Sequence, residues 1–107
     1  MPLLNPPAAG NSTASTATPA TVVSATNASG VPTSTLLVAA NPARKGVTVW
    51  NSTNATLFLE LGLTATTTAW AARLSPDGYY ELPFSYTGPI AGIWSAANGS
   101  CFVRELT

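Results

Sequence analysis

The sequence contains no histidine and only one cysteine, Cys101. Without an imidazole there is no ready general base near neutral pH and no histidine ligand, so the common catalytic triads and zinc sites are excluded. Glycine patterns that cradle phosphate groups, such as G-x-G-x-x-G, are also missing. We therefore expect no cofactor. A small core that has neither a metal nor a disulfide must rely on partner subunits.

Charged side chains are equally scarce. They make up 7% of the 107 residues, with four basic and four acidic groups and no formal net charge, whereas an ordinary soluble domain carries about 25%. A neutral chain has no electrostatic attraction for phosphate backbones or anionic lipids, so we expect neither a nucleic acid nor a membrane as partner. The one basic pair, Arg44-Lys45, is interpreted as a solvated turn or an interface charge.

Long apolar runs are absent too. No stretch approaches the roughly 18 apolar residues of a membrane span, and residues 1–10 lack the basic and apolar regions of a signal peptide. We expect a protein that is made in the cytoplasm.

What the sequence has in abundance is serine, threonine and alanine, concentrated toward the N-terminus. Of the nineteen residues from 11 to 29, eleven are Ser, Thr or Asn and five are Ala, and the first charged side chain is that of Arg44. Five prolines spread over residues 1–33 keep a helix from forming there. We expect residues 1–33 to form a long extended N-terminal arm and residues 34–107 to form the folded domain.

Beyond residue 33 the sequence changes to short runs of branched and aromatic residues separated by turn residues. The third run, TLFLELGL, places Leu57, Leu59 and Leu61 on one face, which is the two-residue period of a half-buried strand. The pattern predicts an all-β domain, a small antiparallel β-sandwich or barrel, with the leucine face and Trp94 in its core. The seven predicted strands are STLLVAA, GVTVWN, TLFLELGL, AWAARL, GYYELP, IAGIWSA and CFVREL.

Three segments have the composition of tight turns: residues 51–56, 75–78 and 96–100. In the last of them, Asn98-Gly99 suits the positive φ angles of a two-residue hairpin turn. We therefore expect the strands near residues 90–96 and 101–106 to pair with each other as an antiparallel hairpin.

Four carboxylates and Cys101 remain as candidate catalytic groups. Asp77 occupies a turn in SPDG, whereas Glu60, Glu81 and Glu105 alternate with apolar residues, as the solvent-facing positions of strands do. A pair of these acids acting in glycoside hydrolysis is a weaker interpretation. A lone cysteine in a strand is usually a small buried hydrophobic residue. We expect no enzymatic activity.

Two segments, ARKGVTVWNSTNATLFLELG and SPDGYYELPFSYTGPIAGIWSAANGSCFVREL, resemble small structural proteins of tailed bacteriophages, especially those that infect cyanobacteria. The similar part covers about residues 42–106 and contains no enzymatic motif. The resemblance implies a β-rich virion component that cements or decorates the capsid, or that belongs to the neck or tail. Its location would be the virion, after synthesis in the host cytoplasm.

Such a component would bind the major capsid protein or another virion protein. Low charge and a small core also favour self-association, and a homotrimer is the oligomer that we expect. A capsid or sister subunit would hold the arm through backbone hydrogen bonds and a few apolar side chains. The predicted interface residues are Leu3, Leu4, Val22, Val23, Val31 and Trp70, the last of them near a sheet edge.

Two alternatives remain open. The chain could be a carbohydrate-binding module of a phage tail fibre or spike, and an exposed aromatic row beside Asn or Asp side chains would favour that function. It could also be a neck or tail adaptor, which only its location in the particle distinguishes from a decoration protein. Because a small β domain needs its large side chains in the core, we expect burial to be the main role of Trp50, Trp70, Tyr79, Tyr80, Tyr86 and Trp94.

Overall fold

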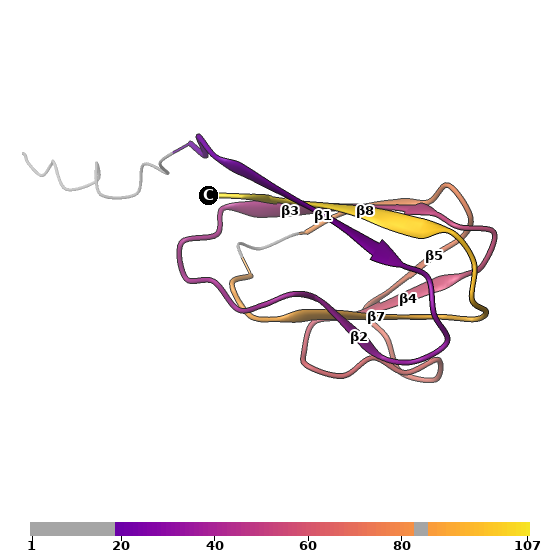
Figure 1. Cartoon of the computed structure of the whole chain (residues 1–107). Coiled ribbons are helices and arrows are strands. Elements are labelled where there is room, and N and C mark those ends of the chain that lie inside the picture. Colours follow the sequence, from indigo (N-terminus) through magenta and orange to yellow (C-terminus); the bar gives the residue numbers. More distant parts are fainter. Residues whose placement is uncertain (1–18, 83–85) are drawn as a thin grey trace, which may run out of the picture.

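The computed structural model describes residues 19–82 and 86–107, and the elements in these ranges are eight β-strands (Figure 1). All seven strands that the sequence predicts are present, and one strand is additional. An all-β fold is therefore confirmed. The strands are β1 (Val23–Ser29), β2 (Thr35–Val38), β3 (Gly46–Ser52), β4 (Leu57–Glu60), β5 (Ala72–Leu74), β6 (Tyr79–Glu81), β7 (Ile90–Trp94) and β8 (Ser100–Leu106).

The strands form two four-stranded sheets, which lie as two layers in Figure 1. Sheet A has the strand order β1-β8-β3-β6, sheet B has the order β2-β7-β4-β5, and each neighbouring pair is antiparallel. Each connection between successive strands changes sheet, except the one from β4 to β5. This arrangement is the eight-stranded jelly roll, a form of β-sandwich.

The core lies between the two sheets, because alternate residues of each strand point inward. From sheet B, Leu57, Leu59 and Trp94 are fully buried, which confirms the predicted leucine face and core tryptophan. Leu61 follows the end of β4 and is only half-buried. Sheet A contributes Val47, Val49, Cys101 and Val103.

The predicted boundary at residue 33 is wrong, because β1 lies inside the predicted arm. Its seven residues pair with β8 of the same chain, from Val23 opposite Leu106 to Ser29 opposite Ser100. Six of the seven side chains are exposed. Backbone hydrogen bonds to β8 hold this strand in the sheet, and its sequence therefore shows no apolar pattern by which it could be predicted. The first eighteen residues of the predicted arm, with Leu3 and Leu4, lie outside the described residues.

The predicted hairpin at Asn98-Gly99 is also wrong. β7 belongs to sheet B and β8 to sheet A, so the segment between them crosses from one sheet to the other. Gly99 does adopt a positive φ of 52°. Its carbonyl accepts a hydrogen bond from the N–H of Gly30 (3.0 Å), and the N–H of Asn98 donates to the carbonyl of Gly30 (3.1 Å). The two residues therefore bind the β1–β2 loop at one end of the sandwich.

Asn51, at the start of the predicted 51–56 turn, is a buried residue of β3 at the same end. Its Nδ2 donates to the carbonyl oxygens of Ala55 (2.9 Å) and Leu74 (3.1 Å). Its Oδ1 accepts hydrogen bonds from Thr53 Oγ1 (2.7 Å) and Trp94 Nε1 (3.3 Å). Both polar atoms of the side chain are used, as a buried amide requires.

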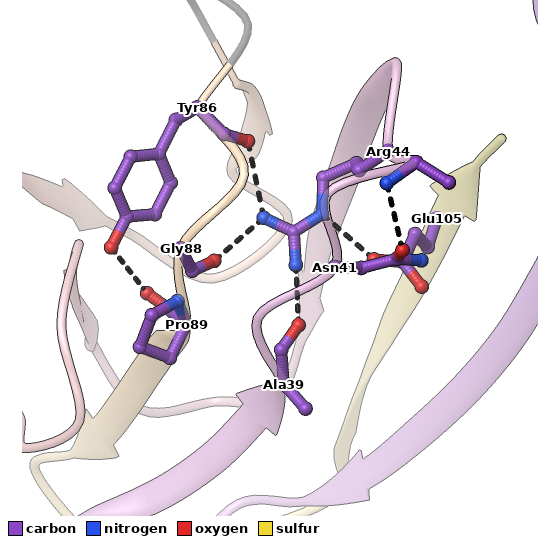
Figure 2. Close-up of polar contacts among 8 residues, drawn as sticks. Ala39, Asn41, Arg44, Tyr86, Gly88, Pro89 and Glu105 are labelled. Atoms are coloured by element: carbon purple, nitrogen blue, oxygen red, sulfur yellow. Dashed lines mark hydrogen bonds and ion pairs between the residues drawn. The ribbon is translucent and has the colours of Figure 1, made fainter.

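Arg44 occupies the corresponding position at the opposite end, and its interpretation as a solvated turn or interface charge is wrong. The side chain has no exposed surface. Nε donates to Glu105 Oε2 (2.7 Å), Nη1 to the carbonyls of Tyr86 (3.1 Å) and Gly88 (2.7 Å), and Nη2 to the carbonyl of Ala39 (2.6 Å) (Figure 2). A guanidinium presents five N–H donors in a rigid fork, so one residue ties the β2–β3 loop, the segment before β7 and β8 together.

Replacing Arg44 by methionine is expected to lower the free energy of unfolding by about 3 kcal/mol, because Glu105 and three carbonyls lose their donor. Arg44→Lys should restore only part of the loss, since one ammonium group cannot reach acceptors on several sides. The control is Lys45→Met at the exposed next position, with an expected change below about 0.5 kcal/mol. Urea denaturation measures all three, and equal losses at both positions would contradict a structural role for Arg44.

Deleting residues 1–30 is expected to destabilise the domain, whereas deleting residues 1–18 leaves each described strand in place. The longer deletion removes β1, at about 0.5–1.5 kcal/mol net for each main-chain hydrogen bond, and leaves β8 with an unpaired edge that promotes aggregation. Thermal unfolding and sedimentation of the two truncated proteins test this expectation. Equal melting temperatures would show that β1 is not part of the stable unit.

Candidate functional site

The one cysteine is placed where it has little reactivity. Cys101 lies fully buried on β8 between the sheets, and burial raises the pKa of its thiol to about 11. At neutral pH the group is therefore a thiol rather than the nucleophilic thiolate. This placement confirms the prediction that Cys101 is a small buried residue.

Three of the four carboxylates occupy positions that serve the fold: one is in an ion pair, one accepts a backbone hydrogen bond and one lies in a tight turn. Glu105 is paired with Arg44 rather than facing solvent as predicted, and Glu60 accepts a hydrogen bond from the N–H of Leu61 (2.9 Å). Asp77 adopts a φ of 66° in the turn between β5 and β6, as predicted for this residue. Among residues 19–82 and 86–107, no three His, Cys, Asp or Glu side chains gather into a possible metal site. The same ranges contain no helix with the length and apolarity to cross a membrane.

Three aromatic side chains line up across the outer face of sheet A. Trp50 on β3 lies opposite Phe102 on β8 and, on its other side, opposite Tyr79 on β6. Their exposed fractions are 51%, 37% and 56%, so all three point away from the core. The register continues to the edge of the sheet, where Asn27 on β1 lies opposite Phe102. The term aromatic row is used below for Asn27, Phe102, Trp50 and Tyr79, which together cross all four strands of sheet A.

Polar side chains border the aromatic row on both sides. Because side chains two residues apart on a strand share a face, the pairing register defines the neighbouring rows. One border consists of three paired serines on β1, β8 and β3: Ser29, Ser100 and Ser52. The other border carries two charged residues and a threonine on β8, β3 and β6: Arg104, Thr48 and Glu81.

Hydrogen bonds fix the side chains at both ends of the aromatic row. Tyr79 Oη donates to Glu81 Oε2 (3.2 Å), and Arg104 Nη1 donates to Asn27 Oδ1 (3.3 Å). Desolvation, the hydrogen bond to Glu81 and the negative charge of Glu81 all raise the pKa of Tyr79, so its phenol stays protonated. An asparagine whose oxygen is engaged still offers two N–H donors.

A second exposed surface lies on the outer face of sheet B and on the loop between β4 and β5. Leu36 on β2 is 49% exposed, and Leu63 and Trp70 in the loop are 73% and 42% exposed. Phe58 on β4 is half-buried, with its ring centroid 5.9 Å from that of Trp70, and Ile93 lies opposite Phe58 on β7. The term sheet-B face is used below for Leu36, Phe58, Leu63, Trp70 and Ile93.

The loop that carries Leu63 and Trp70 is packed against the sheet. It passes below β2 and β7 in Figure 1, and the N–H of Ala65 in this loop donates to Ser34 Oγ next to β2 (2.8 Å). Ala65 is itself buried. The exposed side chains of the loop are therefore held over sheet B.

The predicted interface residues that are described lie on different sheets. Val22 and Val23 are exposed at the start of β1 in sheet A. Trp70 is exposed just before β5, the outermost strand of sheet B, which agrees with the edge position predicted for it. Val31 is half-buried, and its carbonyl accepts a hydrogen bond from the N–H of Trp94 (3.0 Å).

The exposure of the aromatic row is not predicted from the sequence, where burial is the expected role of the aromatic residues. Trp94 is fully buried, and Tyr80 and Tyr86 pack against the core. Trp50, Trp70 and Tyr79 are exposed, contrary to the expected burial, and Phe102 is not among the sequence candidates. A usable signal is the position of Trp50 beside Val49 and of Phe102 beside Val103, because alternation along a strand places neighbouring side chains on opposite faces. The sequence does not reveal that β3, β6 and β8 are neighbours.

Comparisons with protein families, with curated proteins and with solved structures found no match to this chain. The functional conclusion therefore depends on the exposed surfaces of the domain.

Native protein at pH 8 should react with an aromatic disulfide reagent at least about 100-fold more slowly than the unfolded chain. The rise of the pKa of Cys101 from 9.0 to about 11 lowers the fraction of thiolate at this pH about 100-fold. Burial also slows the access of the reagent to the sulfur atom. A protein with Cys101→Ser and Ser52→Cys carries its thiol on the exposed face of β3 and should react without delay. Rapid labelling of Cys101 in the folded wild type would contradict the buried position.

Proposed function

We propose that the chain is a non-enzymatic structural protein of a virion, a capsid decoration or cement subunit that binds the head shell. One support is the sequence pattern of about residues 42–106, from which a resemblance to small structural proteins of tailed bacteriophages was inferred, and viral capsid domains are among the proteins built as jelly rolls. A shared architecture does not by itself define a function, so the surfaces of the domain have to support the proposal.

The observation that carries the proposal is the sheet-B face. Leu36, Leu63 and Trp70 are each at least 42% exposed, in a chain with only 7% charged residues. Exposed apolar surface on a soluble domain marks protein contacts when it is concentrated on one side. Trp70 has the guanidinium carbon of Arg73 at 6.0 Å from its ring centroid, and Trp and Arg are the residues that dominate binding energy at interfaces. A shell protein that covers this face removes its apolar atoms from water.

The N-terminal end belongs to the same proposal. The N–H of Thr21 bonds to the carbonyl of Thr107 (3.2 Å) beside the outermost strand of sheet A, and Val22 and Val23 are exposed there. These valines, with Leu3 and Leu4, are the proposed anchors of the arm on the capsid or on a sister subunit. Self-association as a homotrimer is part of the same proposal.

Antibody labelling of purified particles, followed by electron microscopy, should locate the chain on the head shell. Labelling confined to the neck or tail would identify an adaptor instead, and absence of the chain from particles would overturn the proposal.

The variant Leu36→Ser/Leu63→Ser/Trp70→Ser should lower the affinity for shells that lack the subunit at least about tenfold, which corresponds to about 1.4 kcal/mol. All three side chains are exposed, so the fold should be retained. Trp50→Ser is the matched control, because it removes an exposed indole from sheet A. Cosedimentation with shells measures the affinity, and unchanged binding of the triple variant would contradict the role of the sheet-B face.

A further inference from the structure

We propose that the aromatic row is a binding site for a neutral polysaccharide of β-1,4-linked pyranose rings. This inference goes beyond the proposed function, because a decoration subunit needs only its contact with the shell. The row lies on sheet A and the sheet-B face on the opposite layer, so one domain has room to bind a shell and a glycan at the same time.

The spacing of the aromatic side chains fits an extended glycan. Phe102, Trp50 and Tyr79 start from directly paired positions on three adjacent strands, and neighbouring strands are about 4.7–4.9 Å apart. Successive rings of an extended β-1,4-linked chain repeat at a similar distance. The C–H faces of pyranose rings are apolar and pack flat on aromatic side chains, which offer large rigid surfaces.

The polar borders of the row fit the edges of the same chain. A β-1,4-linked glycan is apolar on its ring faces and carries hydroxyl groups along both edges. The aromatic row has the matching cross-section, with serine hydroxyls along one border and Thr48 and Glu81 on the other. Asn27 adds amide donors at the end of the row. A few such polar groups beside an apolar surface fix the orientation of a bound ligand.

The same borders make a protein partner a poorer fit. A protein interface has a broad apolar centre surrounded by a polar rim, and the row is too narrow to form such a centre. Trp50 has Thr48 and Ser52 as its same-face neighbours on β3, and Phe102 is flanked in the same way on β8 by a serine and an arginine. The exposed aromatic surface is therefore a line and not a patch.

The charges beside the row select a neutral ligand. Arg104 and Glu81 belong to the same border and have opposite signs. Both already have partners within the protein, Arg104 in Asn27 and Glu81 in Tyr79. An acidic polysaccharide would find one engaged guanidinium and a carboxylate that repels it, whereas a neutral chain loses nothing by this arrangement.

The test is isothermal titration of the full-length protein with two neutral β-1,4-linked hexasaccharides, cellohexaose and N-acetylchitohexaose. We expect saturable binding of at least one. Trp50→Ala should weaken it at least about tenfold, equivalent to about 1.4 kcal/mol, with smaller losses for Phe102→Ala and Tyr79→Ala. Trp70→Ala is the matched control, since it removes an exposed indole from the other sheet and should leave the dissociation constant unchanged.

Several outcomes would overturn the inference. These are no binding of either hexasaccharide at millimolar concentration, equal losses in the Trp50 and Trp70 variants, or equally tight binding of maltohexaose, whose α linkages curve the chain. A change in the sedimentation of the ligand-free protein on Trp50→Ala would show that the row joins copies of this chain instead. Circular dichroism checks the fold of each variant. None of these measurements uses capsid shells, so failure of the proposed function leaves them unaffected.

Discussion

Arg44 carries a positive charge that has no contact with water, and one end of the sandwich is assembled from the acceptors that this charge needs. The carboxylate of Glu105 and carbonyls from two other segments surround its guanidinium (Figure 2). A buried charge is tolerated only when it is paired and fully hydrogen-bonded, so the β2–β3 loop, the segment before β7 and β8 keep their places together. β8 pairs with both β1 and β3 and carries Phe102. The register of the aromatic row therefore depends on Arg44, although the side chain of Arg44 lies neither in the row nor on its borders.

Asn51 fastens the opposite end in a similar way, with an amide in place of a charge. Loops usually carry the binding residues of a β-sandwich, because they are the variable part of a rigid scaffold. Here many loop groups are occupied with one another: Gly30 bonds to Gly99, and Asn98 Oδ1 accepts a hydrogen bond from the N–H of Asn54 (3.0 Å). The large exposed side chains of the two proposed binding surfaces lie instead on the outer faces of the two sheets and on the β4–β5 loop that is packed against sheet B.

Strands such as β3 and β4 could be predicted from the sequence because buried and more exposed positions alternate along them. Four of the five residues of β7 are buried, and this strand could be predicted from its short apolar run between turn residues. The distribution of the strands between two sheets could not be predicted, since alternation does not say which strands are neighbours. Asn98-Gly99 allows a hairpin locally, but Trp94 and Cys101 fill the core from opposite sheets. β1 has no apolar pattern because its side chains are exposed at an edge. The sequence Arg44-Lys45 is typical of a solvated turn, and the burial of Arg44 could not be predicted because its acceptors include distant groups between residues 86 and 105. The aromatic row could not be predicted for a similar reason, since it depends on the pairing of strands that are far apart in the sequence.

The strand that completes sheet A is also the last of the eight described strands. β8 lies between β1 and β3, so before residues 100–106 leave the ribosome β1 has no partner and β3 can pair only with β6. Sheet B likewise cannot be complete before β7 has been made, because β7 lies between β2 and β4. Pairings between distant segments form slowly, because a long loop must close before any contact rewards it. Neither sheet can therefore be completed before β7 and β8 have been made, and the earlier strands, which follow a stretch of 43 uncharged residues or belong to it, keep unpaired edges until then.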